Sequence, residues 1–553
     1  MATLTGFETE LATSRYCVIL PQIYRKPVVF CQAAKFALCC FGAELRSSRV
    51  RNCPKIQLFI DALQVEAPPV DLPGERRRAV MIFGLIVFVF AVWLAVHIPW
   101  GTLAQTDELL TAERAREMLM TEPWVVHYNF QVSFEKPPLQ FWLTCLTLPR
   151  FENRSTAVRV WPLTYAALTA VALGWLAFLV QPARPRLMPL AVAILVACPL
   201  FSTEACRAML DIGLTFFTTL TIVFAELARK RPSWWVMVAI ACWLGSLQKV
   251  PLPFLVWILI VIVRLIDRAE RARLRDGSGW LIGSMVLAIS LMSIWPLLQL
   301  IKYHMQVGSL YNQEIVVWLG PDGLGRRTYF YVPLAFPFVA GLSGLLLLLA
   351  PIATLFSKQQ RLAAAIREIA IICLSVIALT IVANFRSVRY LLPILPCLCL
   401  LLAVIFCRLL EQGGRIRTRT VAALALILFA GLLQTELQII LRIKKVAEEK
   451  VITERLGEMQ QPGTKTVLIK AIRPSHDLMW DSFYLFHGNF RFPVSSYTVG
   501  EIRSKRPQPP LVGACVARDF PAVKEVYPNA VVKLVRAQFM CWQVPAATTP
   551  APP

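Results

Sequence analysis

Carboxylates and cations stand where apolar segments of this sequence begin or end, and together they could perform acid–base and anion-binding chemistry. Asp107 and Glu108 follow the first long apolar segment, and Asp211 stands at the start of a later one. A carboxylate beside a substrate hydroxyl can take its proton, and basic side chains can bind a phosphate group. The candidate phosphate-binding cations are Lys136, Lys249, Arg386 and Arg389.

Each of these residues also has a purely structural interpretation. Asp107 and Glu108 would complement a helix dipole at its N-terminus, and Asp211 would cap a helix. Lys249 would extend its ammonium group to the lipid headgroups. These interpretations explain each residue alone, but they explain poorly why both signs of charge collect at segment ends on one side. We therefore expect a functional site there.

The composition identifies the kind of molecule that must position these residues. Of the 553 residues, 57% are hydrophobic and 16% are charged, a balance typical of membrane proteins. The net charge of +23 could indicate nucleic-acid binding. However, the basic residues form short clusters between apolar segments of about 20 residues, the length that crosses a bilayer. The charge therefore indicates membrane topology, and no nucleic-acid partner is expected.

Eleven apolar segments are expected to span the membrane. They lie near 79–99, 157–180, 187–201, 209–228, 234–248, 250–263, 280–300, 331–356, 368–384, 390–407 and 420–440. The predicted fold class is thus a polytopic α-helical membrane protein. The segments 234–248 and 250–263 are separated by little more than Lys249, so that pair is the least distinct.

Charge asymmetry predicts the orientation of these spans. If Arg76, Arg77 and Arg78 are cytoplasmic, the alternation that follows puts most basic residues of the short loops on the cytoplasmic side, as the positive-inside rule requires. Residues 1–78 are then a cytoplasmic leader or the product of an over-long start assignment. The loop 100–156 and the hydrophilic stretch 441–553 face outward.

The C-terminal stretch 441–553 has the pattern of a small α/β extracytoplasmic domain. Its candidate strands are Lys465–Lys470, Leu511–Ala517, Ala530–Val535 and Gln538–Val544. Cys515 and Cys541 are candidates for a disulfide if this domain is outside the cytoplasm. The final segment, Pro545–Pro553, is rich in Ala, Thr and Pro and is expected to be unstructured.

The predicted topology brings the candidate site residues to one side of the membrane. The centres of the spans carry essentially no ionisable residues, whereas ion-coupled transporters usually keep such groups at mid-depth. The acids and cations lie at the outward ends instead, beside the loop 100–156. This placement indicates a site for an anionic, lipid-linked substrate at the membrane surface.

Motifs in the outward loop and at later span ends are similar to those of one enzyme family. The loop carries Asp107-Glu108, Ala115-Arg116-Glu117-Met118-Leu119, Trp124 and Phe134-Glu135-Lys136-Pro137-Pro138. It resembles the first periplasmic loop of the aminoarabinose (lipid A) transferase family, which is related to protein O-mannosyltransferases and has the C-type glycosyltransferase fold. Three later motifs also resemble this family, namely Arg207–Asp211, Gln248–Pro251 and Tyr390–Pro396. The similarity to the family covers roughly residues 79–410.

The sequence departs from this family's pattern at four positions. Leu110 and Thr111 stand where the family commonly has a basic residue and Tyr, Ser133 replaces an aromatic Tyr, and Val250 replaces a Gly. The acids and lysines of the motifs remain. The reaction class is therefore expected to persist, with a substrate other than the aminoarabinose one.

The resemblance implies an integral-membrane glycosyltransferase of the bacterial inner (plasma) membrane. The enzyme would move a sugar from a polyprenyl-phosphate donor to an acceptor on the periplasmic face, where lipid A, a protein or a glycan all fit as the acceptor. Asp107 would be the base or the acid that orients the acceptor, with Asp211 sharing that site and Glu108 as a further catalytic acid. Lys136 and Lys249 would bind the donor phosphate, with Arg386 or Arg389 as helpers.

Two alternatives and one cofactor question stay open at this point. A transporter or flippase of a lipid-linked saccharide would share the membrane architecture, and a non-enzymatic scaffold would use the C-terminal domain to bind a partner. The sequence shows no Cys/His cluster with the spacing of a metal site, so no metal site is predicted. Two neighbouring acids could nevertheless hold a divalent ion.

Overall fold

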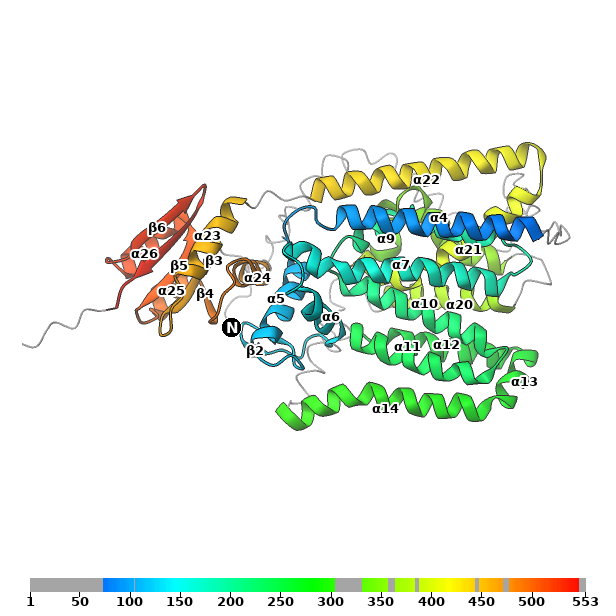
Figure 1. Ribbon diagram of the computed structural model, residues 1–553, viewed down its shortest axis with the longest axis horizontal. Helices are drawn as coiled ribbons and strands as arrows, with labels where there is room; N and C mark the ends of the chain where they lie inside the picture. The colour runs from blue at the N-terminus through cyan, green and yellow to red at the C-terminus, as the bar shows by residue number, and fades with distance from the viewer. Residues whose placement is uncertain are drawn as a thin grey trace, which may run out of the picture. The chain divides into compact units, whose positions relative to one another are not determined.

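A computed structural model describes residues 73–103, 105–303, 331–356, 364–382, 387–442, 447–470 and 477–546. Of the predicted leader, residues 1–72 lie outside these ranges, as do residues 547–553 of the expected unstructured end. The described chain consists of a helical bundle followed by a small domain with a β-sheet (Figure 1).

Each of the eleven predicted spans coincides with one or more helices. The bundle helices are α4 (Pro73–His97), α7 (Arg154–Val180), α8 (Leu187–Val196), α9 (Pro199–Ala205), α10 (Leu210–Ala228), α11 (Trp235–Gln248), α12 (Leu252–Ile266), α14 (Ser278–Tyr303), α18 (Tyr331–Val339), α19 (Gly344–Leu355), α20 (Ala364–Val382), α21 (Leu395–Glu411) and α22 (Gly414–Arg442). Seven helices of the described chain are long and apolar enough to cross a membrane. The predicted polytopic fold is confirmed.

The predicted span 187–201 is bent. Helices α8 and α9 meet at an angle of 69°, and together they would form an eighth crossing. Pro199 is the first residue of α9, a position that proline favours because it cannot donate a backbone hydrogen bond to the preceding turn. The bend sends the chain after α9 into the turn 206–209, which leads to Asp211.

The helices differ in how deeply they are buried. Helix α21 is almost completely buried and packs against α8 and α19, whereas α4, α14 and α22 expose most of their side chains, which are apolar. An apolar exposed surface on a long helix is expected where lipid replaces water as the solvent. Helix α21 is therefore the centre of the bundle, with α4, α14 and α22 at its edge (Figure 1).

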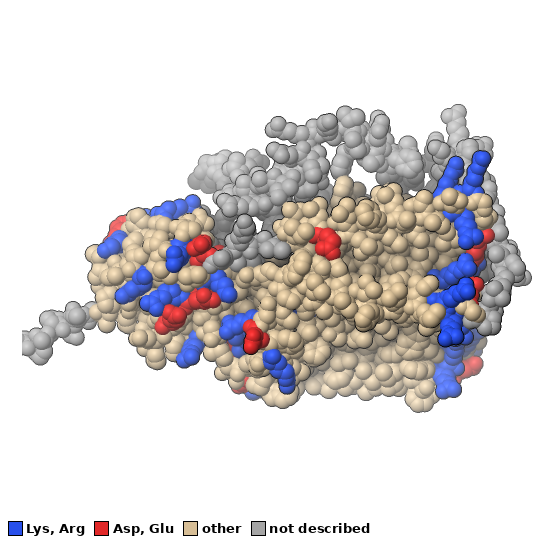
Figure 2. Space-filling view, turned by 45° about the horizontal axis from the view of Figure 1, so that its top comes forward, with Lys and Arg blue, Asp and Glu red and all other residues tan. Residues whose placement is uncertain are grey.

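The two ends of the bundle carry different residues. One end, which we call the basic end, holds the loops after α7, α10, α12 and α21, and Figure 2 shows Lys and Arg gathered there. It includes the short helix α13 (Arg268–Asp276). The other end, which we call the loop end, carries α5 (Thr106–Met120), the strands β1 (His127–Tyr128) and β2 (Gln131–Val132), and α6 (Leu139–Thr147).

Buried ion pairs tie four helices together at the basic end. Arg264 of α12 bonds Glu226 of α10 at 3.0 Å and Glu368 of α20 at 2.8 Å. Arg229 adds bonds to Glu368 at 2.6 Å and to Glu270 of α13 at 2.7 Å. Because each buried charge has opposite charges beside it, the cost of removing it from water is offset.

The C-terminal domain contains a five-stranded mixed sheet in the order β4-β3-β5-β7-β6. Its strands are β3 (Lys465–Lys470), β4 (Val494–Thr498), β5 (Leu511–Val516), β6 (Val531–Arg536) and β7 (Phe539–Val544), and its helices are α23 (Ala447–Glu458), α24 (Asp477–His487), α25 (Val499–Lys505) and α26 (Phe520–Val526). The predicted α/β class is confirmed. All four predicted strands form, and β4 is an additional edge strand.

Cys515 and Cys541 are buried free thiols on neighbouring strands. Cys515 packs into the cluster that contains Trp542, and Cys541 packs into the cluster on the other sheet face that contains Tyr484. Because the two side chains belong to different clusters, the candidate disulfide does not form.

The C-terminal domain contacts α5 and the β1–β2 hairpin through buried polar bonds. Arg116 of α5 binds Glu113 through two nitrogens and donates a third bond to the carbonyl of Phe490 at 2.7 Å. The side-chain amide of Asn129 donates to the carbonyl of Val494 at 2.9 Å and accepts from its N–H at 2.8 Å. Asn129 thus occupies both backbone groups of a residue at the edge strand β4.

A histidine adds a pH-sensitive bond to this contact. His487 Nε2 donates to the carbonyl of Leu103 at 2.8 Å. Burial lowers the pKa of His487, and although the Leu103 bond opposes this, the charges of Lys450 and Arg154 add to it, giving a pKa of about 4. The folded pKa is below the ordinary value of about 6.5. The neutral form therefore supports the fold above pH 6.5, and this support is lost as pH falls toward 4.

We predict that His487→Gln flattens the pH dependence of stability, because glutamine can still donate to Leu103 but does not titrate. Thermal unfolding of the purified protein at pH values between 7.5 and 4.5 measures this. The melting temperature of the wild type should fall more steeply below pH 6.5 than that of the variant. Parallel curves would show that His487 does not titrate across the transition.

Candidate functional site

The loop end is organised by a buried salt bridge between α5 and α7. Both carboxylate oxygens of Glu108 accept bonds from Arg159, at 2.9 and 3.3 Å. The backbone N–H of Ala208, in the turn after α9, donates to the same carboxylate at 3.0 Å. Arg159 also donates to the carbonyls of Ile98 and Trp100 at the end of α4, at 3.0 and 2.7 Å. One ion pair therefore connects α4, α5, α7 and the turn that precedes Asp211.

Glu108 stays ionised in this setting. Its burial favours the neutral form, but the charge and hydrogen bonds of Arg159, together with Arg207 and the Ala208 N–H, hold the pKa of Glu108 below its ordinary value. A carboxylate whose oxygens are bound by a buried arginine is poorly placed to accept a substrate proton. This environment suits Glu108 to a positioning role, and the catalytic role that the sequence suggested for it stays a prediction.

Asp107 lies in a different environment from its neighbour. Its side chain is 46% exposed, and its Oδ2 accepts a bond from Arg389 Nη1 at 2.8 Å. Arg389 is also held by the hydroxyl of Ser387 at 3.2 Å and lies 3.7 Å from the sulfur of Met209. Asp107 is thus accessible from solvent and already paired with a cation.

A second acid–cation pair lies on the next helices. Lys249, which follows α11, donates to Asp211 Oδ1 at 2.7 Å. Asp211 is almost fully buried in the first turn of α10, whereas Lys249 retains 18% exposure. The ammonium group of Lys249 also lies 5.5 Å from the centre of the Tyr390 ring, a cation–π distance.

One short helix contacts both pairs. The 3₁₀ helix η4 (Val388–Ile394) carries Arg389, which binds Asp107, and the next residue, Tyr390, which faces Lys249. Successive residues of a helix point in different directions, so adjacent residues can serve the two pairs. The structure therefore brings Asp107, Asp211, Lys249 and Arg389 into one cluster around η4.

Lys136 lies in the loop between β2 and α6. Its ammonium group lies 3.7 Å from Glu135, whose carboxylate binds Arg114 of α5. Four residues later, Gln140 of α6 accepts a bond from Gln248 at 3.0 Å, and Gln248 precedes Lys249. The buried amide pair thus fixes the start of α6 against the end of α11.

The structure adds residues that the sequence analysis missed and leaves one prediction outside the described ranges. Arg159 was not singled out, although a lone arginine within the predicted span 157–180 was a usable signal. Tyr390 belonged to a recognised motif but had no assigned role. Arg386 lies in the segment 383–386, outside the described residues.

A small cavity lies beside the Glu108–Arg159 pair. Its volume is about 50 Å³, and its polar lining includes His97, Thr203 and Arg207. This volume is comparable with one or two water molecules. Within the described ranges, no three His, Cys, Asp or Glu side chains cluster as metal ligands.

Comparison with known proteins connects this geometry with membrane glycosyltransferases. The family model for dolichyl-phosphate-mannose-protein mannosyltransferases matches residues 78–309. The undecaprenyl phosphate-α-4-amino-4-deoxy-L-arabinose arabinosyl transferase of Pseudomonas aeruginosa is 26% identical over 363 residues, 62% of each chain. That of Yersinia pestis is 28% identical over 199 residues, 35% of each chain. The matched stretches thus cover about one to two thirds of these relatives.

Solved structures show the same fold over most of the chain. ArnT from Cupriavidus metallidurans bound to undecaprenyl phosphate is 16% identical, with a TM-score of 0.63 over 86% of this chain and 99% of that one. The oligosaccharyltransferase of Archaeoglobus fulgidus is 12% identical, with a TM-score of 0.53 over 76% and 64%. The resemblance found in the motifs is confirmed, and the chain has the fold of the C-type glycosyltransferases.

We predict that Glu108 and Asp107 differ in their effect on stability. Glu108→Gln leaves the buried Arg159 without its counter-charge, so the free energy of unfolding should fall by about 3–5 kcal/mol. Asp107→Asn removes a half-exposed pair and should cost about 1 kcal/mol or less. Thermal unfolding of both variants in the same detergent measures the difference. Equal melting temperatures would contradict the positioning role of Glu108.

Proposed function

We propose that this chain, which has the fold of the C-type glycosyltransferases, transfers a sugar from a polyprenyl-phosphate donor to an acceptor hydroxyl at the membrane surface. The observation that carries the proposal is the η4 cluster, in which Arg389 pairs with Asp107 and Tyr390 faces the Lys249–Asp211 pair. Such a cluster offers the two groups that the reaction needs, a proton acceptor and fixed positive charge.

Asp107 is the proposed general base. The acceptor oxygen attacks the anomeric carbon and loses its proton to the Asp107 carboxylate while the bond from that carbon to the phosphate oxygen breaks. The 46% exposure of Asp107 supports this role, because the acceptor must reach it. Asp211 is buried against Lys249 and is better suited to orient that lysine.

Lys249 and Lys136 are the proposed phosphate-binding residues, with Arg386 and Arg389 as candidate helpers. The departing polyprenyl phosphate gains negative charge as the bond to the sugar breaks, and fixed cations stabilise this charge. Lysine suits the task because its ammonium group can donate to several phosphate oxygens. The undecaprenyl phosphate named with the Cupriavidus structure is a donor carrier of this chemical class.

We propose that the loop end faces the periplasm and that the protein lies in the bacterial inner membrane. The concentration of Lys and Arg at the opposite end supports this orientation through the positive-inside rule (Figure 2). The transferase domain would be 79–440, with 100–156 as its catalytic outer loop. Residues 441–553 would be an extracytoplasmic domain that braces α5.

The acceptor remains a choice among lipid A, a protein and a glycan. Leu110 and Thr111 stand on α5 where the family commonly has a basic residue and Tyr, and both are buried. Because neither side chain is charged, these two positions offer no charge to the substrate. This difference supports a substrate other than the aminoarabinose one.

A transfer assay in isolated membranes tests the proposal. Radiolabelled polyprenyl-phosphate sugars are supplied as a panel, and label on acceptors is counted. We predict that Asp107→Asn lowers transfer by at least a hundredfold, since removal of a general base commonly costs that much. Asp211→Asn should also lower transfer, because Lys249 loses the carboxylate that orients it. Glu152→Gln, which changes an exposed carboxylate in the same outer loop, should retain transfer.

Two results would contradict the proposal. Normal transfer by both aspartate variants would show that these carboxylates are helix caps. Label that crosses the bilayer without reaching an acceptor, at equal rates in all variants, would indicate the alternative function, a flippase of the lipid-linked sugar.

A further inference from the structure

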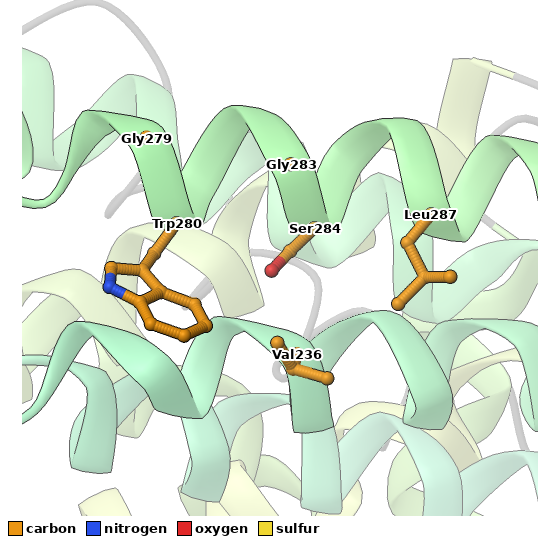
Figure 3. Close-up of a pocket in the computed structure, with 6 residues that line it drawn as sticks. All are labelled: Val236, Gly279, Trp280, Gly283, Ser284 and Leu287. Carbon is orange, nitrogen blue, oxygen red and sulfur yellow. The ribbon is translucent and has the colours of Figure 1, made fainter.

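A crevice opens between α11 and α14 at the basic end of the bundle, away from the η4 cluster. It has a volume of about 370 Å³ and is lined by Val236 of α11 and by Gly279, Trp280, Gly283, Ser284 and Leu287 of α14 (Figure 3). This volume is within the range of small-ligand sites. Val236 lies 13 residues before Lys249, which places the crevice about 20 Å along the helix from that lysine.

Ser284 gives the crevice a polar group that needs a partner. The residue is only 2% exposed, and within the described part of the chain its Oγ has no hydrogen-bond partner. Figure 3 shows this oxygen directed from α14 into the space toward α11. A buried hydroxyl without a partner carries an uncompensated desolvation cost. A ligand with an acceptor oxygen in the crevice would remove that cost.

Two glycines keep the crevice open along α14. Gly279 and Gly283 are one helical turn apart, on the same side of the helix, and a Cβ added at either would meet no atom within 4 Å. Trp280 flanks them with 54% exposure, as interfacial tryptophans do. Leu287 lies one turn further from the basic end and is apolar. The lining of the crevice is therefore largely apolar, with the Ser284 hydroxyl as a polar group within it.

Positive charge stands next to the crevice. Helix α13 ends at Asp276, two residues before α14 begins, and its exposed arginines are Arg268, Arg271, Arg273 and Arg275. Of these, Arg273 is bound to Glu270. Clusters of basic residues beside a membrane helix attract anionic lipid headgroups.

We propose that this crevice binds an anionic phospholipid of the leaflet at the basic end. One acyl chain would lie along Gly279, Gly283 and Leu287, and an ester carbonyl of the lipid would accept the Ser284 hydroxyl. The headgroup phosphate would lie among the arginines of α13. The site is separate from the donor site and does not depend on the proposed function.

The observations favour a lipid over a helix from a second copy. A pair of glycines four residues apart is also a common contact between membrane helices. However, a second helix would satisfy only the glycines, whereas a phospholipid also satisfies the buried hydroxyl and the arginines at the crevice mouth. The second copy is therefore an outcome that the experiment must distinguish.

Lipid binding to the full-length protein tests the proposal. The protein is delipidated in a mild detergent and titrated with dioleoyl-phosphatidylglycerol or dioleoyl-phosphatidylcholine, and bound lipid is counted by native mass spectrometry. We predict that phosphatidylglycerol binds at least tenfold more tightly than phosphatidylcholine. Gly283→Leu fills the crevice and should weaken phosphatidylglycerol binding at least fivefold. Arg271→Gln combined with Arg275→Gln should remove the preference for phosphatidylglycerol.

The matched control is Gly84→Leu in α4, another exposed glycine whose added Cβ would meet open space. It should leave phosphatidylglycerol binding unchanged. Inorganic phosphate at millimolar concentration should not displace the lipid, because the chain contributes to binding; displacement would indicate a headgroup-only anion site and overturn the proposal. Equal loss of lipid in both glycine variants would also overturn it. A change from dimer to monomer in Gly283→Leu, without lipid loss, would identify a second copy as the occupant.

Discussion

The site depends on the buried Glu108–Arg159 salt bridge at the loop end. Because an isolated charge is costly in a low-dielectric setting, each partner holds the other in place. The bridge spans α5 and α7, and its hydrogen bonds reach the end of α4 and the turn that leads to Asp211. Asp107 is the next residue along α5 from this anchor. Its exposed carboxylate is therefore positioned by the backbone of a helix whose first turn cannot shift without breaking a buried ion pair.

The two acid–cation pairs at η4 differ in burial, and this difference suits them to different roles. The Asp211–Lys249 and Asp107–Arg389 pairs both contact η4, but the first is buried on its acid side while the second is open. The C-terminal domain adds a further constraint, because Arg116 and Asn129 bind backbone groups of that domain. The outer loop is thus fixed on one side by the bundle and on the other by the sheet, a degree of order that proton transfer requires.

Much of the fold and of the candidate site could be predicted from the sequence, because bilayer crossing and charge placement leave strong local patterns. The apolar runs indicated every helical segment of the bundle, and the acids and lysines were found at the ends of those runs. Long-range pairing was not predictable. The salt bridge between Glu108 and Arg159 joins residues that are 51 positions apart in the sequence. The edge strand β4 was missed because it is short and mixed in polarity. The bend between α8 and α9 was not predicted either, because the segment 187–201 is apolar throughout and indicated a single span.

In the proposed reaction, Asp107 acts on the acceptor while Lys249 holds the donor phosphate, and donor binding without turnover separates these two roles. Sugar-free undecaprenyl phosphate is titrated into the wild type, Asp107→Asn and Lys249→Met. We predict that Asp107→Asn binds undecaprenyl phosphate as tightly as the wild type or more tightly, because a negative charge beside the phosphate is removed. Lys249→Met should bind at least tenfold more weakly. Equal affinities for all three proteins, or a loss of affinity confined to Asp107→Asn, would contradict these roles of Asp107 and Lys249.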